Sequence, residues 1–101
     1  IGNDCHVGEN NSPGDKFQAK RSVIGNNCQI GNEVKIVNSL IMDGVTIKDS
    51  CSITNSIVCS HAEIGEKCDL KDSIVSQGLK IPSGKKATNE LIGEDVLNMA
   101  L

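Results

Sequence analysis

Apolar or small residues recur along this chain in steps of 6, 6 and 5 residues, so equivalent positions return every 17 residues. An α-helix repeats about every 3.6 residues and a strand about every 2, so neither element alone explains this spacing. A long fixed period indicates a solenoid, in which each coil of the chain packs on the coil before it. The anchor positions that define the period are Ile1, Val7, Pro13, Ala19, Ile24, Ile30, Ile36, Ile41, Ile47, Ile53, Val58, Ile64, Leu70, Val75, Ile81, Ala87 and Ile92.

Each repeat unit is predicted to be one short strand followed by one corner. A second apolar residue, usually small, follows several anchors by four positions, and turn-forming pairs such as Asn26-Asn27 stand just before it. Because side chains alternate along a strand, the anchor points inward and the residue before it points outward. Three units therefore close one three-sided coil. The second apolar positions are Cys5, Cys28, Val34, Val45, Cys51, Ala62 and Cys68.

The composition agrees with a narrow interior. The chain of 101 residues contains one aromatic residue, Phe17, and no Tyr or Trp. Pro cannot donate to a strand ladder, and both prolines, Pro13 and Pro82, fall in the outermost coils. The sequence thus predicts an all-β parallel β-helix over residues 1–97, with a C-terminal tail at 98–101. The start at Ile1, without Met and within a repeat, indicates a segment of a longer protein.

Charge and cysteine content exclude several classes of function. A net charge of -3 and the lack of stacking aromatics argue against nucleic-acid binding. No segment approaches the roughly 20 apolar residues of a membrane-spanning helix.

The five cysteines form no C-x-x-C pair, which argues against zinc and favours a reducing, cytosolic compartment. Cys51 and Cys68, one period apart, are expected to be buried thiols, although their spacing would permit a disulfide. Cys59 is expected outside, and hence to be the most reactive.

The five-residue unit predicts an aliphatic row on one outer face. Strict alternation sends Ser39 inward and Leu40 outward, and the same parity applies once in every coil. A contiguous apolar row on a small rod indicates a contact surface, here for a partner subunit or for a domain outside this segment. Alternatively, a distorted corner would swing these residues inward and leave the serines in the turn. If the row points outward, Ile57→Asp should abolish assembly without unfolding the domain. If the row points inward, the same substitution should unfold the domain. The predicted interface residues are Val23, Leu40, Ile57, Ile74 and Leu91, with Met42 and Cys59 beside them.

The corresponding outward positions on the other two faces are all polar. They are Ser12, Gln29, Thr46, Glu63 and Lys80 on one face, and Gln18, Lys35, Ser52, Asp69 and Lys86 on the other.

The runs RSVIGNNCQIG (21–31), NSLIMDGVTIKDSCSITNSIVCSHAEIGEKCDLKDSIV (38–75) and NELIGEDVL (89–97) resemble the C-terminal β-helices of sugar-nucleotide pyrophosphorylase-like proteins. Among these, the chain is most similar to the gamma subunits of eukaryotic translation initiation factor 2B. The resemblance covers nearly the whole chain and implies the left-handed form of the β-helix, since residue spacing does not determine handedness. The sequence departs from the repeat at Pro13 and Phe17, where we expect a bulky plug, and at Lys85 and Glu90, where we expect a frayed or capped final coil.

The resemblance implies a non-catalytic scaffold domain that assembles with the catalytic epsilon subunit, and through it with the remaining subunits. The complex would be the cytosolic guanine-nucleotide exchange factor for initiation factor 2, its client. Two other functions stay open: the regulatory β-helix of a true sugar-nucleotide pyrophosphorylase, and a trimeric hexapeptide acyltransferase.

Catalysis by the segment itself is not expected. An acyltransferase would use His6 or His61, but the sequence places no orienting carboxylate beside either one. His61 stands at a corner position that often requires a positive φ, which His tolerates. A carbonic-anhydrase site needs three metal-binding histidines, and the chain has two. We therefore predict no catalytic residue, no metal and no cofactor.

Overall fold

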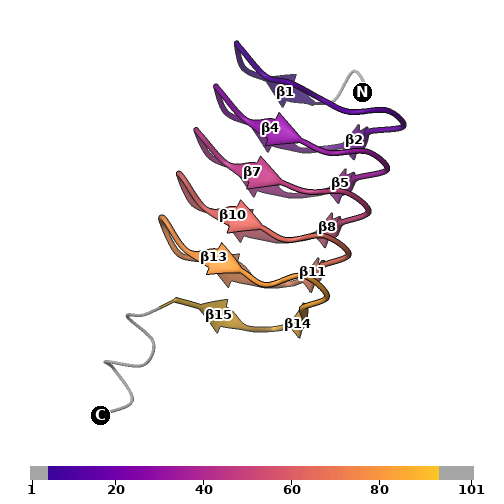
Figure 1. Ribbon diagram of the computed structural model, residues 1–101. Coiled ribbons are helices and arrows are strands. Elements are labelled where there is room, and N and C mark those ends of the chain that lie inside the picture. Colours follow the sequence, from indigo (N-terminus) through magenta and orange to yellow (C-terminus); the bar gives the residue numbers. More distant parts are fainter. Residues whose placement is uncertain (1–4, 94–101) are drawn as a thin grey trace.

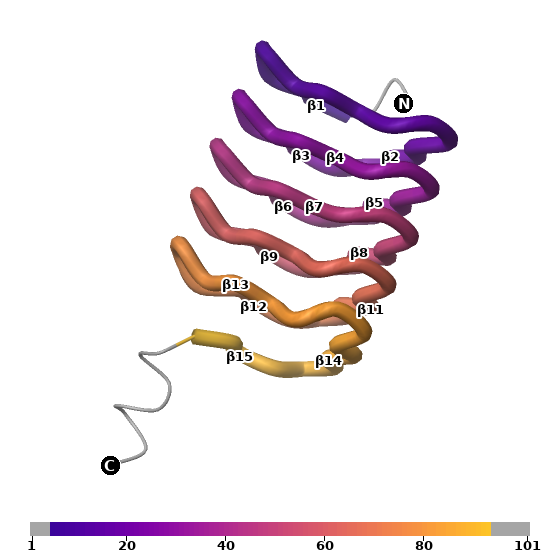
Figure 2. Tube along the Cα trace, viewed as in Figure 1, coloured from indigo at the N-terminus to yellow at the C-terminus, as the bar shows by residue number. Residues whose placement is uncertain are grey.

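The computed structural model describes residues 5–93, which form a left-handed parallel β-helix (Figure 1). The chain advances as stacked three-sided coils, and strands of successive coils lie side by side (Figure 2). Each side of the coil builds one parallel sheet, and no helix occurs among the described residues. The described part of the chain therefore contains no helix long and apolar enough to cross a membrane.

The three sheets are called A, B and C. Sheet A contains β1 (His6–Val7), β3 (Val23–Ile24), β6 (Leu40–Ile41), β9 (Ile57–Val58), β12 (Ile74–Val75) and β15 (Leu91–Ile92). Sheet B contains β4 (Gln29–Ile30), β7 (Thr46–Ile47), β10 (Glu63–Ile64) and β13 (Lys80–Ile81). Sheet C contains β2 (Gln18–Lys20), β5 (Lys35–Val37), β8 (Ser52–Thr54), β11 (Asp69–Lys71) and β14 (Lys86–Thr88).

The register confirms the 17-residue period predicted from the sequence. Ile24 pairs with Ile41, Ile41 with Val58 and Val58 with Val75, so this column of anchors stacks directly in sheet A. All four side chains are fully buried. Because parallel strands need a crossover between them, the other two sides of each coil serve as the connection.

Each corner contains one residue with a positive φ. In a single coil these residues are Asn27 (φ 60°), Glu33 (φ 58°) and Asn38 (φ 51°). Asn adopts this conformation more readily than most residues, which explains the turn-forming pairs in the sequence. His61 has a φ of 62°, as expected from its corner position.

The core is a column of aliphatic and small side chains. Cys28, Val34 and Ile36 are fully buried, and all thirteen predicted anchors from Ala19 to Ala87 are buried. Phe17 packs against the N-terminal end of this core, as the predicted plug requires. Lys85 Nζ lies 3.5 Å from Glu90 Oε2, so the two irregular residues of the last coil pair with each other.

One predicted anchor is wrong. Pro13 is exposed, because it stands in the first coil, where no described coil precedes it, and only Ser12 beside it bridges to sheet B. Ile1, residues 94–97 of the predicted β-helix and the predicted tail lie outside the described residues.

Candidate functional surface

Sheet A carries a continuous row of aliphatic side chains on its outer surface. Val23, Ile74 and Leu91 are 44%, 41% and 51% exposed. Leu40 and Ile57 stand in register between them, on β6 and β9, and are half-buried. The side chains thus point outward as predicted, and the alternative in which the corner swings them inward is wrong.

Buried serines explain why the aliphatic side chains point outward. Ser22, Ser39 and Ser56 stand immediately before the aliphatic residues, and they are 2%, 6% and 1% exposed. Each hydroxyl donates to the carbonyl two residues earlier, as from Ser39 Oγ to Val37 O at 2.8 Å. The same oxygen accepts from the serine of the next coil, as from Ser56 N at 3.1 Å.

This serine column continues to Ser73, whose Oγ accepts from Glu90 N at 3.2 Å. Every buried side-chain N and O atom in residues 5–93 has a hydrogen-bond partner. The small serine side chain fits inside the tight corner and forms hydrogen bonds with backbone N–H and C=O groups. Because side chains alternate along the strand, the next residue points outward. The five-residue unit therefore produces the aliphatic row.

The row has neutral neighbours. Met42 and Cys59 follow the buried anchors Ile41 and Val58, point outward and are half-buried beside Leu40 and Ile57. At the N-terminal end of the row, His6 pairs with Val23 and is exposed, as predicted. Among the described outward positions of sheet A, no Asp, Glu, Lys or Arg occurs.

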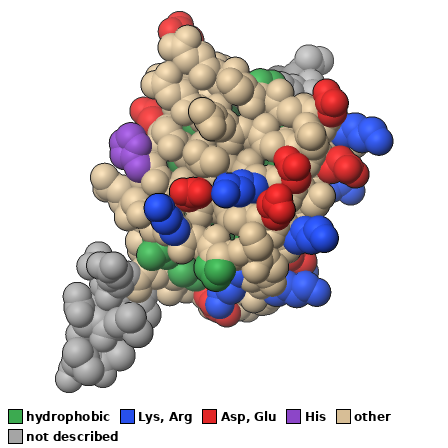
Figure 3. All heavy atoms as spheres, in the orientation of Figure 1, with side chains coloured by type: hydrophobic (Ala, Val, Ile, Leu, Met, Phe, Trp, Pro, Cys, Tyr) green, Lys and Arg blue, Asp and Glu red, His purple; other side chains and the backbone are tan. Residues whose placement is uncertain are grey.

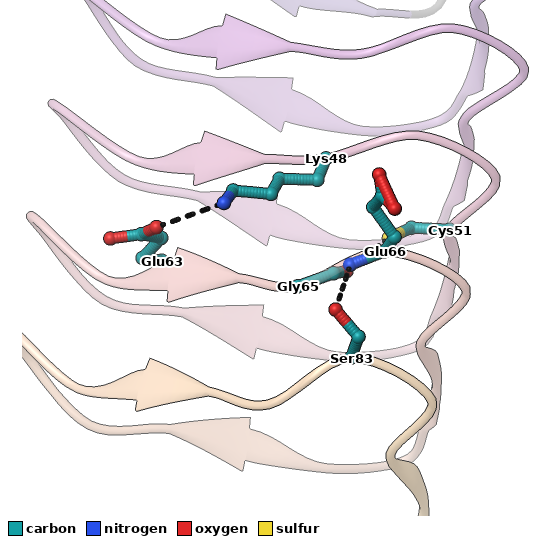
Figure 4. Close-up of polar contacts among 6 residues, drawn as sticks. All are labelled: Lys48, Cys51, Glu63, Gly65, Glu66 and Ser83. Atoms are coloured by element: carbon teal, nitrogen blue, oxygen red, sulfur yellow. Dashed lines mark hydrogen bonds and ion pairs between the residues drawn. The ribbon is translucent and has the colours of Figure 1, made fainter.

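The other two faces are polar, as predicted. On sheet B, Lys48 Nζ lies 3.5 Å from Glu63 Oε1, across neighbouring coils (Figure 4). At the corner between sheets B and C, Glu66 N donates to Ser83 Oγ at 3.1 Å (Figure 4). On the side shown in Figure 3, acidic and basic side chains mix with neutral surface, and hydrophobic side chains occupy few positions.

The thiols divide into an inner and an outer group. Cys51 and Cys68 are free and 2% exposed, and Cys51 Sγ donates to Gly65 O at 3.0 Å. Burial raises the pKa of the Cys51 thiol and that of the Cys28 thiol, which opposes thiolate formation. Cys59 is only half-buried, which agrees with its predicted outward position.

The structure does not bring the histidines together. His6 lies on β1 of sheet A, whereas the exposed His61 stands at the corner between β9 and β10, with its ring against Gly44 of the preceding coil. Within residues 5–93 there is also no group of three or more His, Cys, Asp or Glu side chains placed to hold a metal ion.

Sheet C has a basic character that was not predicted from the sequence. Its outward positions were predicted only to be polar, but four lysines occupy outward positions on the strands: Lys20, Lys35, Lys71 and Lys86. The signal was available, because Lys35 and Lys86 occupy the same column in the 17-residue repeat.

The comparisons with known proteins agree with this architecture. The family described as "EIF2B subunit epsilon LbH domain" matches residues 1–94. No curated protein matches the chain. A solved structure of a candidate acetyltransferase from Bacillus cereus superposes with a TM-score of 0.50 at 21% identity, covering 99% of this chain and 82% of that one. At this identity the likeness shows the fold alone.

Proposed function

Because the chain belongs to the family of epsilon-type left-handed β-helix domains of translation initiation factor 2B, we propose that it is a non-catalytic scaffold of that complex. In this proposal sheet A is the surface that holds the domain against a partner subunit. The observation that supports this proposal most directly is the uncharged aliphatic row, which is partly exposed to solvent. By contrast, the core side chains are buried, and every buried polar side-chain atom of the described residues has a hydrogen-bond partner.

The energetics favour burial of this row in a complex. Complete burial of a fully exposed aliphatic side chain contributes about 1.5–3 kcal/mol, and each of the five side chains in the row, already partly buried, would contribute a part of that. The row is already ordered by the ladders beneath it, so little conformational entropy is lost when a partner covers it. A rigid apolar strip is therefore well suited to holding another folded surface.

The finer assignment is a gamma-type chain whose partner is the catalytic epsilon subunit. Support comes from the resemblance of the Asn-Ser corners at 38–41 and 55–58, and of the run at 89–97, to gamma subunits. The family that matches is described for the epsilon subunit, so an epsilon-type chain is the competing assignment. Guanine-nucleotide exchange on initiation factor 2 would then occur elsewhere in this cytosolic complex.

Retention of purified subunits tests the proposal. The immobilised chain is mixed separately with epsilon and gamma subunits of initiation factor 2B, and we expect it to retain epsilon. Ile57→Asp places a charge in the centre of the row and should lower retention at least about tenfold, because a buried unpaired carboxylate costs several kcal/mol.

Thr46→Asp is the matched control. Thr46 is also half-buried and points outward from a central strand, but on sheet B. It should bind as the unmodified chain does, and circular dichroism should show both variants folded. Retention of gamma alone would indicate an epsilon-type chain. Equal loss in the two variants, or no loss in either, would exclude sheet A as the interface.

A further inference from the structure

Sheet C presents a basic surface on a chain whose net charge is -3. Its outward strand positions include the four lysines Lys20, Lys35, Lys71 and Lys86 and the single acid Asp69. These side chains are exposed. In Figure 3 basic and acidic side chains lie together on the right-hand side, where Figure 1 labels the strands of sheet C.

The register groups these lysines into two pairs. Gln18 stands opposite Lys35 and Lys20 stands opposite Val37, so Lys20 and Lys35 are diagonal neighbours on β2 and β5. Diagonal side chains lie roughly 7 Å apart at their Cβ atoms, within reach of one shared anion.

The second pair has the same geometry three coils further along. Asp69 stands opposite Lys86 and Lys71 opposite Thr88, so Lys71 and Lys86 are diagonal neighbours on β11 and β14. At about 4.8 Å per coil, the two lysine pairs are about 14 Å apart along the rod. The strand between them, β8, presents the neutral residues Ser52 and Thr54.

The first pair borders hollows on the surface of sheet C. Lys20 and Lys35 line a hollow of about 140 Å³ together with Gln18 and Val37. Lys35 also lines a second hollow of about 350 Å³, with Lys16, Glu33 and Ser52. An incoming carboxylate could therefore lie between ammonium groups and accept a hydrogen bond from the Gln18 amide.

No acidic side chain of the described range forms an ion pair with these lysines, although Glu33 lines the larger hollow together with Lys35. Residues 5–93 contain the ion pairs Lys48–Glu63 and Lys85–Glu90, neither of which involves the four lysines on the strands. Asp69 stands opposite Lys86 in the register but forms no ion pair with it. The four ammonium groups are thus available to an external partner.

We propose that sheet C docks an acidic protein segment that lies along the rod, with carboxylates at the two lysine pairs. A protein fits better than RNA because the described outward positions of sheet C include no aromatic ring for base stacking. This surface is separate from the aliphatic row on sheet A.

Fluorescence anisotropy with a labelled peptide of about ten glutamates tests this proposal, at about 50 mM salt to limit screening. The chain should bind the peptide, and added salt should weaken the binding. The double variant Lys20→Gln, Lys35→Gln should lose about tenfold in affinity or more. The single variant Lys35→Gln changes one side chain that borders both hollows and should show a smaller loss of affinity. It replaces the double variant in the test if the double variant unfolds.

The double variant Lys48→Gln, Lys80→Gln is the matched control, because it removes two positive charges from sheet B. It should lose much less affinity, and Ile57→Asp should bind the peptide as the unmodified chain does. Absence of peptide binding would overturn the proposal, as would an equal loss in the sheet B control. Tighter binding of a ten-nucleotide polyuridine than of the glutamate peptide would do the same.

Discussion

Serine is the residue that determines which side chains sheet A exposes. In each complete coil one serine lies inside the corner, donates to its own coil and accepts from the next. The aliphatic residue that follows has no room inside and points outward. A surface property therefore depends on a buried hydroxyl.

Ser56→Ala should destabilise the domain by about 1–3 kcal/mol, because the substitution leaves the buried Ser73 N–H without its acceptor at 3.2 Å. Chemical unfolding followed by circular dichroism measures the change. Ser52→Ala on the outer face of sheet C is the control and should change stability by less than about 0.5 kcal/mol. Equal stability of the two variants would mean that the serine column contributes nothing.

For single residues, the sequence predicted whether a side chain points inward or outward better than it predicted its hydrogen bonds. Alternation placed Leu40 outside and Ser39 inside, which the structure confirms. The hydrogen bonds of the serine column were not predicted, although Ser22, Ser39, Ser56 and Ser73 recur every 17 residues. Periodicity shows that positions are equivalent, but it does not show what a polar side chain in the interior binds.

The coil is the structural element of this fold, and it repeats without a change of register. Ladder bonds connect each residue to residues in the neighbouring coils, as from Leu40 N to Ser56 O at 3.0 Å. Stability in such a fold is approximately a sum of coil and neighbour contributions. The ends are the exception, because they lack a neighbour on one side.

Deletion of residues 40–56 removes one complete period and joins Ser39 to Ile57 in register. The shortened rod should fold with a strand-rich circular dichroism spectrum and a lower unfolding midpoint. Deletion of 40–48 is the control, since it leaves a step of eight residues from the anchor Ile36 to the anchor Ile53, a spacing that fits neither the five-residue nor the six-residue unit. It should yield no folded rod. Similar behaviour of the two deletions would contradict the coil as the folding element.

The elements were largely predictable because the period is regular in the middle of the chain. The prediction was wrong at Pro13, where the anchor is exposed because no described coil covers it on one side. Of the predicted plug, Phe17 packs against the core whereas Pro13 is exposed, and the frayed or capped end expected at Lys85 and Glu90 contains an ion pair between them.

The whole molecule is a rod with three chemically different sides: aliphatic sheet A, polar sheet B and basic sheet C. The sequence revealed the first side because its residues follow one spacing. The third side was not predicted, because its four lysines occupy two different columns of the repeat and Lys20 and Lys35 become diagonal neighbours through the ladder. The subunit identity is not contained in the fold, which different proteins share, and depends on the surfaces.

The central claim is that a partner subunit covers sheet A, and Cys59 beside the row reports this coverage directly. Its rate of alkylation is measured by mass spectrometry in the free chain and after addition of the epsilon subunit. The inner thiols Cys28, Cys51 and Cys68 should react more slowly than Cys59, because they are buried.

Binding should slow the alkylation of Cys59 about tenfold or more, while a cysteine introduced on sheet B by Thr46→Cys keeps its rate. An unchanged rate at Cys59 in a complex that protects the introduced cysteine would contradict the account.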